Sequence, residues 1–297
     1  MHAARSADLV VSHRSAAPGG PPVAEALVAA LGKPLVYDLD DAIYLPPDNG
    51  DSSLRRLVCC DWRCAAIGRR SALVAGGSPV LCDHMRQFNG NIALWPTTVD
   101  TDRCQPRDGR DDKATPVVGW TGSHSTAYYL EQILPALGAL QREHSFDFLV
   151  VGAEVDLAGH GISGRCVPWS AETEDAMVQQ IDIGLMPLLD TQWARGKCAL
   201  KAIQYHAHGA PAVVSDVGVN RDVVLYGETG FLVPPGGDWA PPLRKLLADP
   251  ELRQQMGAKG RAHVVANYSP AVVAGKVARD LRGVLEAGAF GPRPQAA

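Results

Sequence analysis

Short β-rich apolar runs alternate with helical segments along most of the chain, and this alternation restricts its fold more than any other feature. Strands that alternate with helices in this way form parallel sheets joined by crossover helices. The sequence therefore predicts an α/β fold class. In the first part of the chain, the expected strands are residues 8–12, 34–39, 72–75 and 91–95, and the expected helices are 23–31, 53–70 and 79–88.

A second alternating series follows a run that contains no apolar residue, Gln105 to Lys113. Polar runs of this kind connect separate cores, and a length of 297 residues suits two domains. We place the boundary near Thr115. The prediction divides the chain into residues 1–114, residues 115–268, and a C-terminal helix and tail over 269–297.

The second series is expected to contain more strands than the first. Tyr128 to Leu140 has apolar residues at helical spacing and predicts one helix. Pro250 and Pro270 read as helix starts within a helical tail over 239–289. The expected strands are 116–120, 146–151, 165–168, 181–189, 211–215 and 230–233, with a further helix over 198–208.

Composition excludes several classes of protein. The 28 Lys and Arg against 32 Asp and Glu leave a net charge of -4, so the chain has no basic field to hold a nucleic-acid backbone. A hydrophobic content of 46% with 20% charged residues is typical of a globular protein. No apolar run approaches the roughly 20 residues that span a bilayer. We expect a cytoplasmic protein, either free or attached peripherally to the inner membrane face.

The seven cysteines do not suit a disulfide framework, because the count is odd and Cys59 and Cys60 are adjacent. Buried thiols are the favoured interpretation. A zinc site from Cys60, Cys64, Cys82 and His84 is the alternative, although neither half has the tight Cys-x2-Cys spacing of such sites. We predict no metal site.

Two segments have the composition of anion sites. Gly119, Thr121, Gly122 and Ser123 lie between a strand and a helix, where backbone amides and hydroxyls bind phosphate. Such a turn also needs glycine for geometry alone. The neighbouring His124 is either a phosphate contact or a solvent-facing side chain.

The second segment precedes the helix at 198–208. Arg195 and Lys197 flank a glycine at the positive end of that helix, and an anion is the expected ligand. Lys201, inside the helix, either contacts that anion or is a solvated lysine.

Several motifs together resemble the donor-binding domain of retaining glycosyltransferases of family 4, also called group 1. They are residues 182–188, 196–205, 209–215, 218–221 and 227–233, with 36–42 and 95–100 upstream. The resemblance runs from about Val36 to Tyr268. It implies a GT-B fold of two facing Rossmann-like domains with C-terminal helices crossing back. The second domain would hold a nucleotide-diphospho-sugar and the first a hydroxyl acceptor, such as a glycan, a lipid-linked sugar or a small molecule.

The resemblance also assigns donor-site residues and implies no cofactor or metal. The diphosphate would lie against Thr121, Gly122 and Ser123, near Arg195 and Lys197. The base would lie against Pro168 and Trp169, unless that tryptophan is structural. The turn that contacts the sugar and phosphate would be formed by Gly218, Val219, Asn220 and Asp222, the last of which a helix N-terminus favours in any case.

The sequence departs from the family pattern at three places. The family's glutamate pair would fall at Gly196 and Gln204, and Gln204 retains an amide that can bond a ribose diol. Basic residues that commonly follow the first glycine are absent, with Trp120 at one position. We expect Arg195 and Lys197 to supply that charge.

Asp38, Asp40 and Asp41 close the second expected strand, and carboxylates at a strand's C-terminal end bind ligands in this fold class. We expect Asp40 to bond the sugar or to receive the acceptor proton. A metal site and simple loop capping are the alternatives. His206 and His208 lie two apart on a helix and are expected to be structural.

A complete first domain in this family opens with a strand and a glycine-rich loop, whereas residues 8–12 resemble a strand from the middle of the sheet. The resemblance therefore implies a shortened first domain. Either a late start or a protein partner that covers the exposed edge would explain it. The expected function is transfer of a sugar from a nucleotide-diphospho-sugar to a hydroxyl acceptor with retention of configuration. The alternatives are a non-catalytic nucleotide-sugar-binding module and a sugar-nucleotide epimerase of the same fold.

Overall fold

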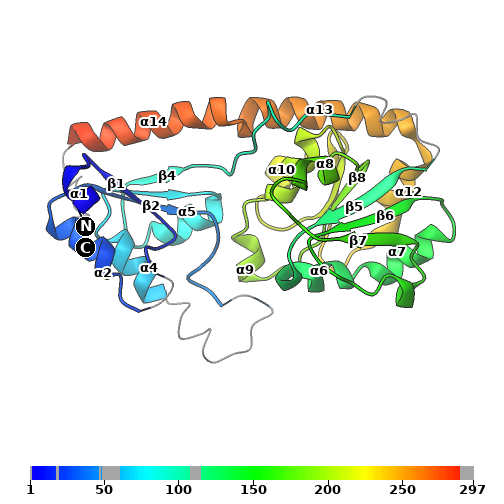
Figure 1. Ribbon diagram of the computed structural model, residues 1–297, viewed down its shortest axis with the longest axis horizontal. Helices are drawn as coiled ribbons and strands as arrows, with labels where there is room; N and C mark the ends of the chain where they lie inside the picture. Colours follow the sequence, from blue (N-terminus) through cyan, green and yellow to red (C-terminus); the bar gives the residue numbers. More distant parts are fainter. Residues whose placement is uncertain (1, 18–19, 47, 49–60, 108–114, 288–297) are drawn as a thin grey trace. The chain divides into compact units, whose positions relative to one another are not determined.

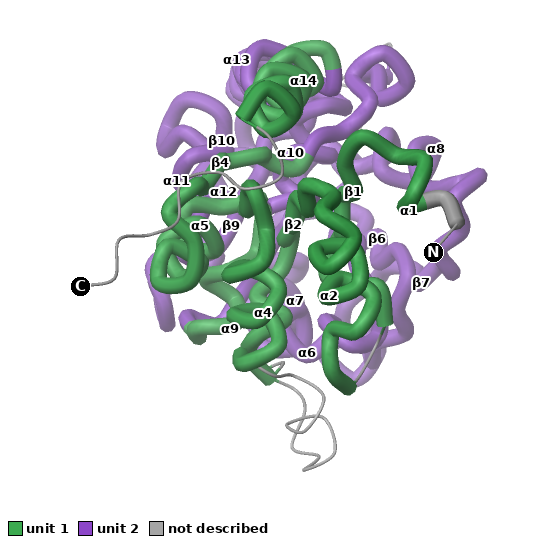
Figure 2. Tube along the Cα trace, turned by 90° about the vertical axis from the view of Figure 1, so that its left-hand side faces the viewer, with its two compact units in different colours: residues 1–97, 191–198, 271–297 green, residues 98–190, 199–270 purple. Residues whose placement is uncertain are grey.

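The computed structural model describes residues 2–17, 20–46, 48, 61–107 and 115–287 and contains two compact units (Figures 1 and 2). Unit 1 comprises residues 1–97, 191–198 and 271–297, and unit 2 comprises residues 98–190 and 199–270. The chain therefore passes between the units several times. Its first crossing, at Thr97 and Thr98, precedes the boundary that we expected near Thr115.

Unit 1 is built on a four-stranded parallel sheet in the order β1-β2-β3-β4. All four strands fall where the apolar runs predict them: β1 Val10–His13, β2 Leu35–Leu39, β3 Leu73–Gly76 and β4 Ile92–Leu94. The helices are α1 His2–Ser6, α2 Val23–Ala30, α4 Asp61–Gly68, α5 Pro79–Met85, α9 Gln192–Arg195 and α14 Pro270–Ala287. Of the helix expected over 53–70, residues 53–60 lie outside the described part.

The last helix of the chain packs against the sheet of unit 1. Val284 on α14 is buried in one cluster with Val36 and Leu73 of the sheet. Trp95, just after β4, donates its indole N–H to Asp280 Oδ2 at 2.8 Å. The helical tail is thus confirmed, and its second half completes the core of unit 1.

Unit 2 contains a six-stranded parallel sheet in the order β10-β9-β8-β5-β6-β7. Its central strands are buried along their whole length, which explains their continuous apolar runs. The strands are β5 Val117–Thr121, β6 Asp147–Val151, β7 Gly164–Val167, β8 Ile183–Met186, β9 Ala212–Ser215 and β10 Gly230–Val233.

The helices of unit 2 include the expected start at Pro250, which follows an Asp249 cap whose carboxylate accepts from Leu252 N at 2.9 Å. The α-helices are α6 Ala127–Glu131, α7 Leu134–Gln141, α8 Glu174–Val178, α10 Leu200–Ala207, α11 Asn220–Val223, α12 Ala240–Ala248 and α13 Pro250–Tyr268. The short 3-10 helices are η2 His124–Thr126 and η3 Ala158–His160.

The single helix expected from Tyr128 to Leu140 is wrong in one respect, because it is two helices, α6 and α7. Pro135 lies in the first turn of α7, and a proline ring excludes the carbonyl four residues earlier, at Glu131, where α6 ends. The apolar face itself is as predicted, since Leu130 and Leu137 are fully buried.

Residues 98–107 pack against the rest of unit 2. This packing explains why unit 2 begins at Thr98 and not near Thr115. The Arg261 guanidinium on α13 donates to the carbonyl of Thr101 at 3.0 Å and to that of Cys104 at 2.7 Å. Pro106 lies against Gly209. A sequence pattern records none of these contacts, because Arg261 lies more than 150 residues further along the chain.

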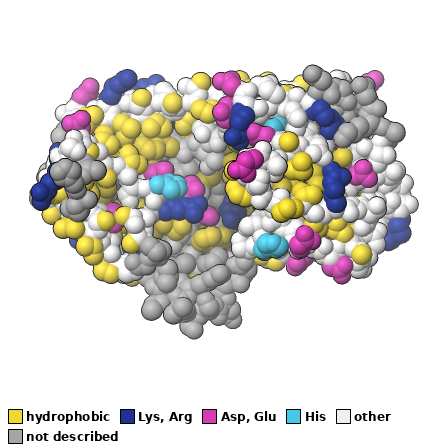
Figure 3. All heavy atoms as spheres, in the orientation of Figure 1, with side chains coloured by type: hydrophobic (Ala, Val, Ile, Leu, Met, Phe, Trp, Pro, Cys, Tyr) yellow, Lys and Arg dark blue, Asp and Glu magenta, His cyan; other side chains and the backbone are white. Residues whose placement is uncertain are grey.

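Basic and acidic side chains are interspersed on the face shown in Figure 3. Among the described helices, none is both long enough and apolar enough to cross a bilayer.

Candidate functional site

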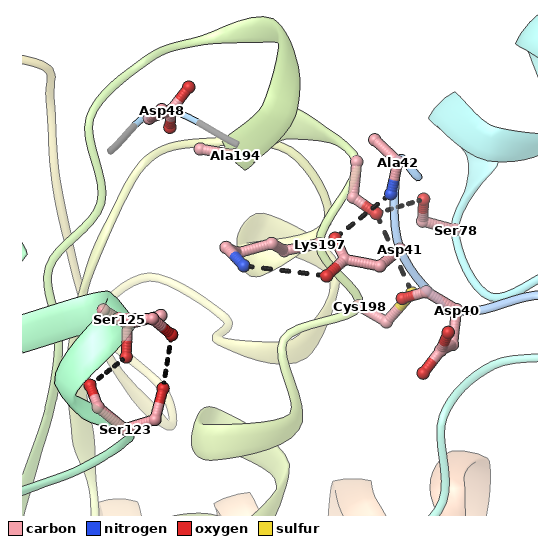
Figure 4. A network of polar contacts seen from close by, with 12 residues as sticks. Asp40, Asp41, Ala42, Asp48, Ser78, Ser123, Ser125, Ala194, Lys197 and Cys198 are labelled. Carbon is pink, nitrogen blue, oxygen red and sulfur yellow. Dashed lines mark hydrogen bonds and ion pairs between the residues drawn. The ribbon is translucent and has the colours of Figure 1, made fainter. Parts of the chain in front are cut away.

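The glycine turn at the end of β5 is the first predicted site element. Gly119 lies inside the strand, where an added Cβ would contact the Ile181 side chain, so its small size serves packing. Gly122 begins the turn, and its N–H donates to Val151 O at 2.9 Å. Ser123 and His124 are exposed, and the Ser123 hydroxyl bonds that of Ser125 at 2.8 Å (Figure 4).

Two aromatic side chains support this turn from within unit 2. An added Cβ at Gly122 would meet the Trp120 ring, which is fully buried and carries the Lys201 ammonium 4.7 Å from its centroid. The Tyr205 hydroxyl accepts from Thr121 N at 3.1 Å and donates to Leu185 O at 3.0 Å. The end of β5 is therefore attached to α10 by a cation–π contact between Lys201 and Trp120 and by the Tyr205 hydroxyl, which also bonds β8.

Gly152, which the sequence reasoning missed, joins the ends of three neighbouring strands. It follows β6, has φ of +90°, and donates its N–H to Val167 O on β7 at 2.8 Å. An added Cβ would contact Gly122 O and would lie 3.2 Å from Trp169 Cβ. A glycine directly after a buried strand was the available signal.

Pro168 and Trp169 follow β7 at the same edge of the sheet. Both are exposed, and the Trp169 side chain is 54% accessible. A structural tryptophan would be buried in the core, so its exposure favours a stacking surface for a ligand.

Gln204 on α10 has a partner on α8, since its amide donates to Glu174 Oε1 at 3.1 Å. This bond explains why an amide suits the position. A glutamate here would place two carboxylates against each other.

Two residues of the turn from Gly218 to Asp222 already form hydrogen bonds with other parts of unit 2. The Asn220 side chain is 1% exposed and donates to Ser215 O at 2.9 Å, so it stabilises the loop after β9. Gly218 has φ of +57°, and Val219 caps the short helix α11. Asp222 is exposed, and its carbonyl accepts from His263 Nε2 at 3.0 Å.

In unit 1, the aspartates after β2 have different partners. Asp40 forms a bidentate ion pair with Arg14, with N–O distances of 2.5 and 2.7 Å. Partial burial acts to raise the pKa of Asp40, but the hydrogen bonds and charge of Arg14 outweigh it and hold that pKa below its usual range. Asp38 bonds His13 Nδ1 at 2.8 Å. A carboxylate with a lowered pKa is a weak proton acceptor, which disfavours the base role that we expected for Asp40.

Asp41 lies in the opposite electrostatic environment. Burial raises the pKa of its carboxyl, although Lys197 Nζ at 4.0 Å acts against that rise. Figure 4 shows this ion pair as a dashed line between the Lys197 ammonium and an Asp41 oxygen. The Asp41 carboxyl therefore holds a proton more tightly than the Asp40 carboxyl does.

The segment carrying Arg195, Gly196 and Lys197 belongs to unit 1 and is packed tightly there. An added Cβ at Gly196 would lie 2.6 Å from Ala42 Cβ, so a glutamate does not fit this position. Cys198 Sγ contacts Asp40 O at 3.1 Å, and Ala199 has φ of +56° before α10 begins. Arg195 ends α9 and is exposed.

The zinc alternative involving Cys60 falls partly outside the described residues. Within the described residues, its other members have different partners: Cys64 accepts from the Tyr37 hydroxyl, Cys82 contacts Ala93 O, and His84 stacks on Tyr44. No disulfide joins the described cysteines.

Both histidines of α10 are buried, as expected of structural residues. Burial lowers the pKa of His206 to about 4. His208 lies beside Cys104 and Asp175.

Unit 2 also contains a cavity of about 300 Å³ at the ends of β8, β9 and β10. Its walls are both polar and apolar, with Gln132, Ser215 and Asp238 among the polar residues. None of the predicted donor residues lines it.

Residues 115–249 match the family described as "Glycosyl transferases group 1". The chain is 26% identical over 218 residues to the D-inositol 3-phosphate glycosyltransferase of Corynebacterium diphtheriae, a match covering 72% of this chain and 43% of that protein. The match thus spans less than half the length of this relative.

Solved structures show the same fold at low sequence identity. A structure of Anabaena Alr3699/HepE with UDP and glucose aligns with a TM-score of 0.72 and 16% identity, covering 95% of this chain and 79% of that chain. A sucrose-phosphate synthase from Thermosynechococcus elongatus aligns with a TM-score of 0.69 and 17% identity, covering 88% and 72%. Residues 115–249 therefore resemble a group 1 glycosyl transferase domain, and the α/β fold of the chain is the GT-B type.

Proposed function

We propose that the chain transfers a sugar from a nucleotide-diphospho-sugar to a hydroxyl acceptor, with retention of anomeric configuration, in the manner of family 4 glycosyltransferases. The observation that carries the proposal is the junction of three strand ends at Gly152, where the Gly122 turn and the exposed Trp169 meet within the matched domain. Ligands bind at the carboxyl ends of strands in open α/β sheets.

Each part of the donor has a matching group in unit 2. The exposed Ser123 hydroxyl and the amides of the turn suit the diphosphate. The half-exposed Trp169 ring suits the base, and the Gln204 amide suits the ribose diol. Uracil is the first base to test, because the Anabaena protein was solved with UDP and with UDP-glucose.

Lys197 and Arg195 are proposed to neutralise the departing diphosphate, so that no metal is required. The proton of the acceptor hydroxyl would pass either to that phosphate or to Asp41. We favour Asp41 over Asp40 among the carboxylates, since Arg14 already occupies both oxygens of Asp40.

Trp169 gives the sharpest test, because its exposure means that truncation removes little packing. We would measure UDP affinity by calorimetry for the intact chain, for Trp169→Ala and for Trp62→Ala. Trp62 on α4 is a matched control with 53% exposure against 54% for Trp169. A base–aromatic stack contributes about 1–3 kcal/mol, so Trp169→Ala should weaken UDP binding about 5- to 150-fold.

Equal UDP affinity for Trp169→Ala and Trp62→Ala would refute the base site. Incubation with UDP-sugars then tests the reaction itself, with NMR of the product reporting its anomeric configuration. A glycoside with retained configuration supports the proposal. Donor binding without turnover points to a binding module, and release of a 2-epimer points to an epimerase.

A further inference from the structure

A cysteine, an aspartate and a histidine from three separate segments of unit 2 bring their donor atoms together. Cys104 lies in the segment before β5, Asp175 in the first turn of α8, and His208 at the C-terminal end of α10. Cys104 Sγ is 3.4 Å and His208 Nε2 is 3.7 Å from Asp175 Oδ1, and all three atoms lie within 4.8 Å of one another.

The surroundings orient two of these groups. His208 Nδ1 lies 3.1 Å from Gln105 O, and because a carbonyl only accepts, the ring proton resides on Nδ1. The Nε2 lone pair is thereby directed at the cluster, as in histidines that bind metals. Arg103 holds Asp175 Oδ2, which leaves Oδ1 for the cysteine and the histidine.

The two separations from Asp175 Oδ1 fit a tetrahedral metal ion. Zinc bonds of about 2.3 Å to sulfur and about 2.0–2.1 Å to nitrogen or oxygen place tetrahedral neighbours about 3.6 Å apart for S and O, and about 3.4 Å apart for N and O. The observed separations of 3.4 and 3.7 Å differ from these by a few tenths of an ångström. Cys104 and His208 are 4% and 2% exposed, whereas Asp175 is only partly buried, so an ion can enter from its side.

We propose that Cys104, Asp175 and His208 bind one Zn²⁺ ion, with water as the fourth ligand. Sulfur and imidazole donors favour zinc over magnesium or calcium. The Cys104 S–H bond breaks as the Zn–S bond forms, and the proton passes to solvent. The thiolate and the carboxylate then balance the charge of the ion.

The ion would join segments that are far apart in the sequence. It would attach the chain around Cys104 to α8 and α10, both within unit 2. It would also fix the start of α8, where Glu174 accepts the hydrogen bond of Gln204. The site is separate from the transfer chemistry and does not depend on the proposed function.

The test uses the purified full chain after removal of metals with a chelator. Zinc binding is measured by competition with a chromophoric chelator, and cobalt substitution reports a thiolate ligand through its charge-transfer absorption. We expect one ion per chain. Cys104→Ser should weaken zinc binding at least about tenfold, since loss of an outer partner alone costs 10- to 100-fold, and it should remove the charge-transfer band.

Cys166→Ser is the matched control, because Cys166 is also in unit 2 but lies outside the cluster, with Sγ near Val155 O. It should retain both zinc affinity and the cobalt band. If Cys104→Ser does not fold, Asp175→Asn provides the second variant and should weaken binding similarly. The proposal is overturned if the intact chain binds no zinc stoichiometrically, or if the cluster variants bind it as tightly as Cys166→Ser does.

Discussion

Replacement of Gly152 by alanine tests the junction on which the donor site depends. Gly152 has φ of +90°, and a Cβ added to it would contact Gly122 O and would lie 3.2 Å from Trp169 Cβ. Gly161 offers a matched control within unit 2, since it has φ of +67° but nothing within 4 Å of an added Cβ. Comparing Gly152→Ala with Gly161→Ala therefore separates the destabilisation caused by the backbone conformation from that caused by the steric contact.

The expected free-energy changes follow from these two terms. A left-handed backbone conformation at an alanine destabilises the folded state by about 1–2 kcal/mol. Alanine also restricts the unfolded chain, and this stabilises the fold by about 0.4–1 kcal/mol. Gly161→Ala should thus lose about 1 kcal/mol. Gly152→Ala must also displace the Gly122 turn or the tryptophan, and such overpacking adds about 1–3 kcal/mol, for a total of about 2–4 kcal/mol.

Thermal and urea unfolding measure both variants directly. At about 2–4 °C per kcal/mol for a domain of this size, Tm should fall about 2–4 °C for Gly161→Ala and about 4–16 °C for Gly152→Ala. If Gly152→Ala is no less stable than Gly161→Ala, the steric argument fails. At a temperature where both are folded, only Gly152→Ala should lose UDP affinity.

Three further outcomes are expected. Gln204→Glu should lower the free energy of unfolding by about 1 kcal/mol through repulsion from Glu174, and adding Glu174→Gln should restore it; urea unfolding that shows no rescue contradicts the pairing. Tyr205→Phe should lose about 1–3 kcal/mol in the same assay, because Thr121 N would be left buried without its hydroxyl partner; an unchanged midpoint would show that water replaces it. For Asp41, the raised folded pKa means that its carboxyl stabilises the fold below its unfolded pKa and that this contribution is lost as pH rises through the folded value. The stability of the intact chain relative to Asp41→Asn should therefore decline as pH is raised from 4 to 7, and a difference that increases with pH would reverse the assignment.

The strands of both sheets could be predicted from the sequence, because a buried parallel strand needs a continuous apolar run and has few alternatives. The break between α6 and α7 was also present in the sequence, as Pro135, but the regular spacing of leucines outweighed it. Local signals of this kind are physical constraints on the backbone and are readable without a structure.

The site could be predicted only in part, because its properties depend on contacts between distant residues. The base role of Asp40 is disfavoured by Arg14, which lies 26 residues earlier, and Gly196 is kept small by Ala42. Neither relation leaves a pattern in the sequence. The same holds for Cys104 and His208, whose side chains become neighbours only when α10 packs on the segment before β5.

The position of α14 in unit 1 has a consequence for biosynthesis. The sheet of unit 1 is translated well before α14, because Asp280, which bonds Trp95, lies 185 residues after it, and Val284, which covers Leu73, lies further along still. This unit therefore reaches its final packing only after every strand of unit 2 has been translated. A chain that stops near Tyr268 would contain every strand of both sheets and still present an uncovered apolar face, which makes it a natural target for chaperones and proteases.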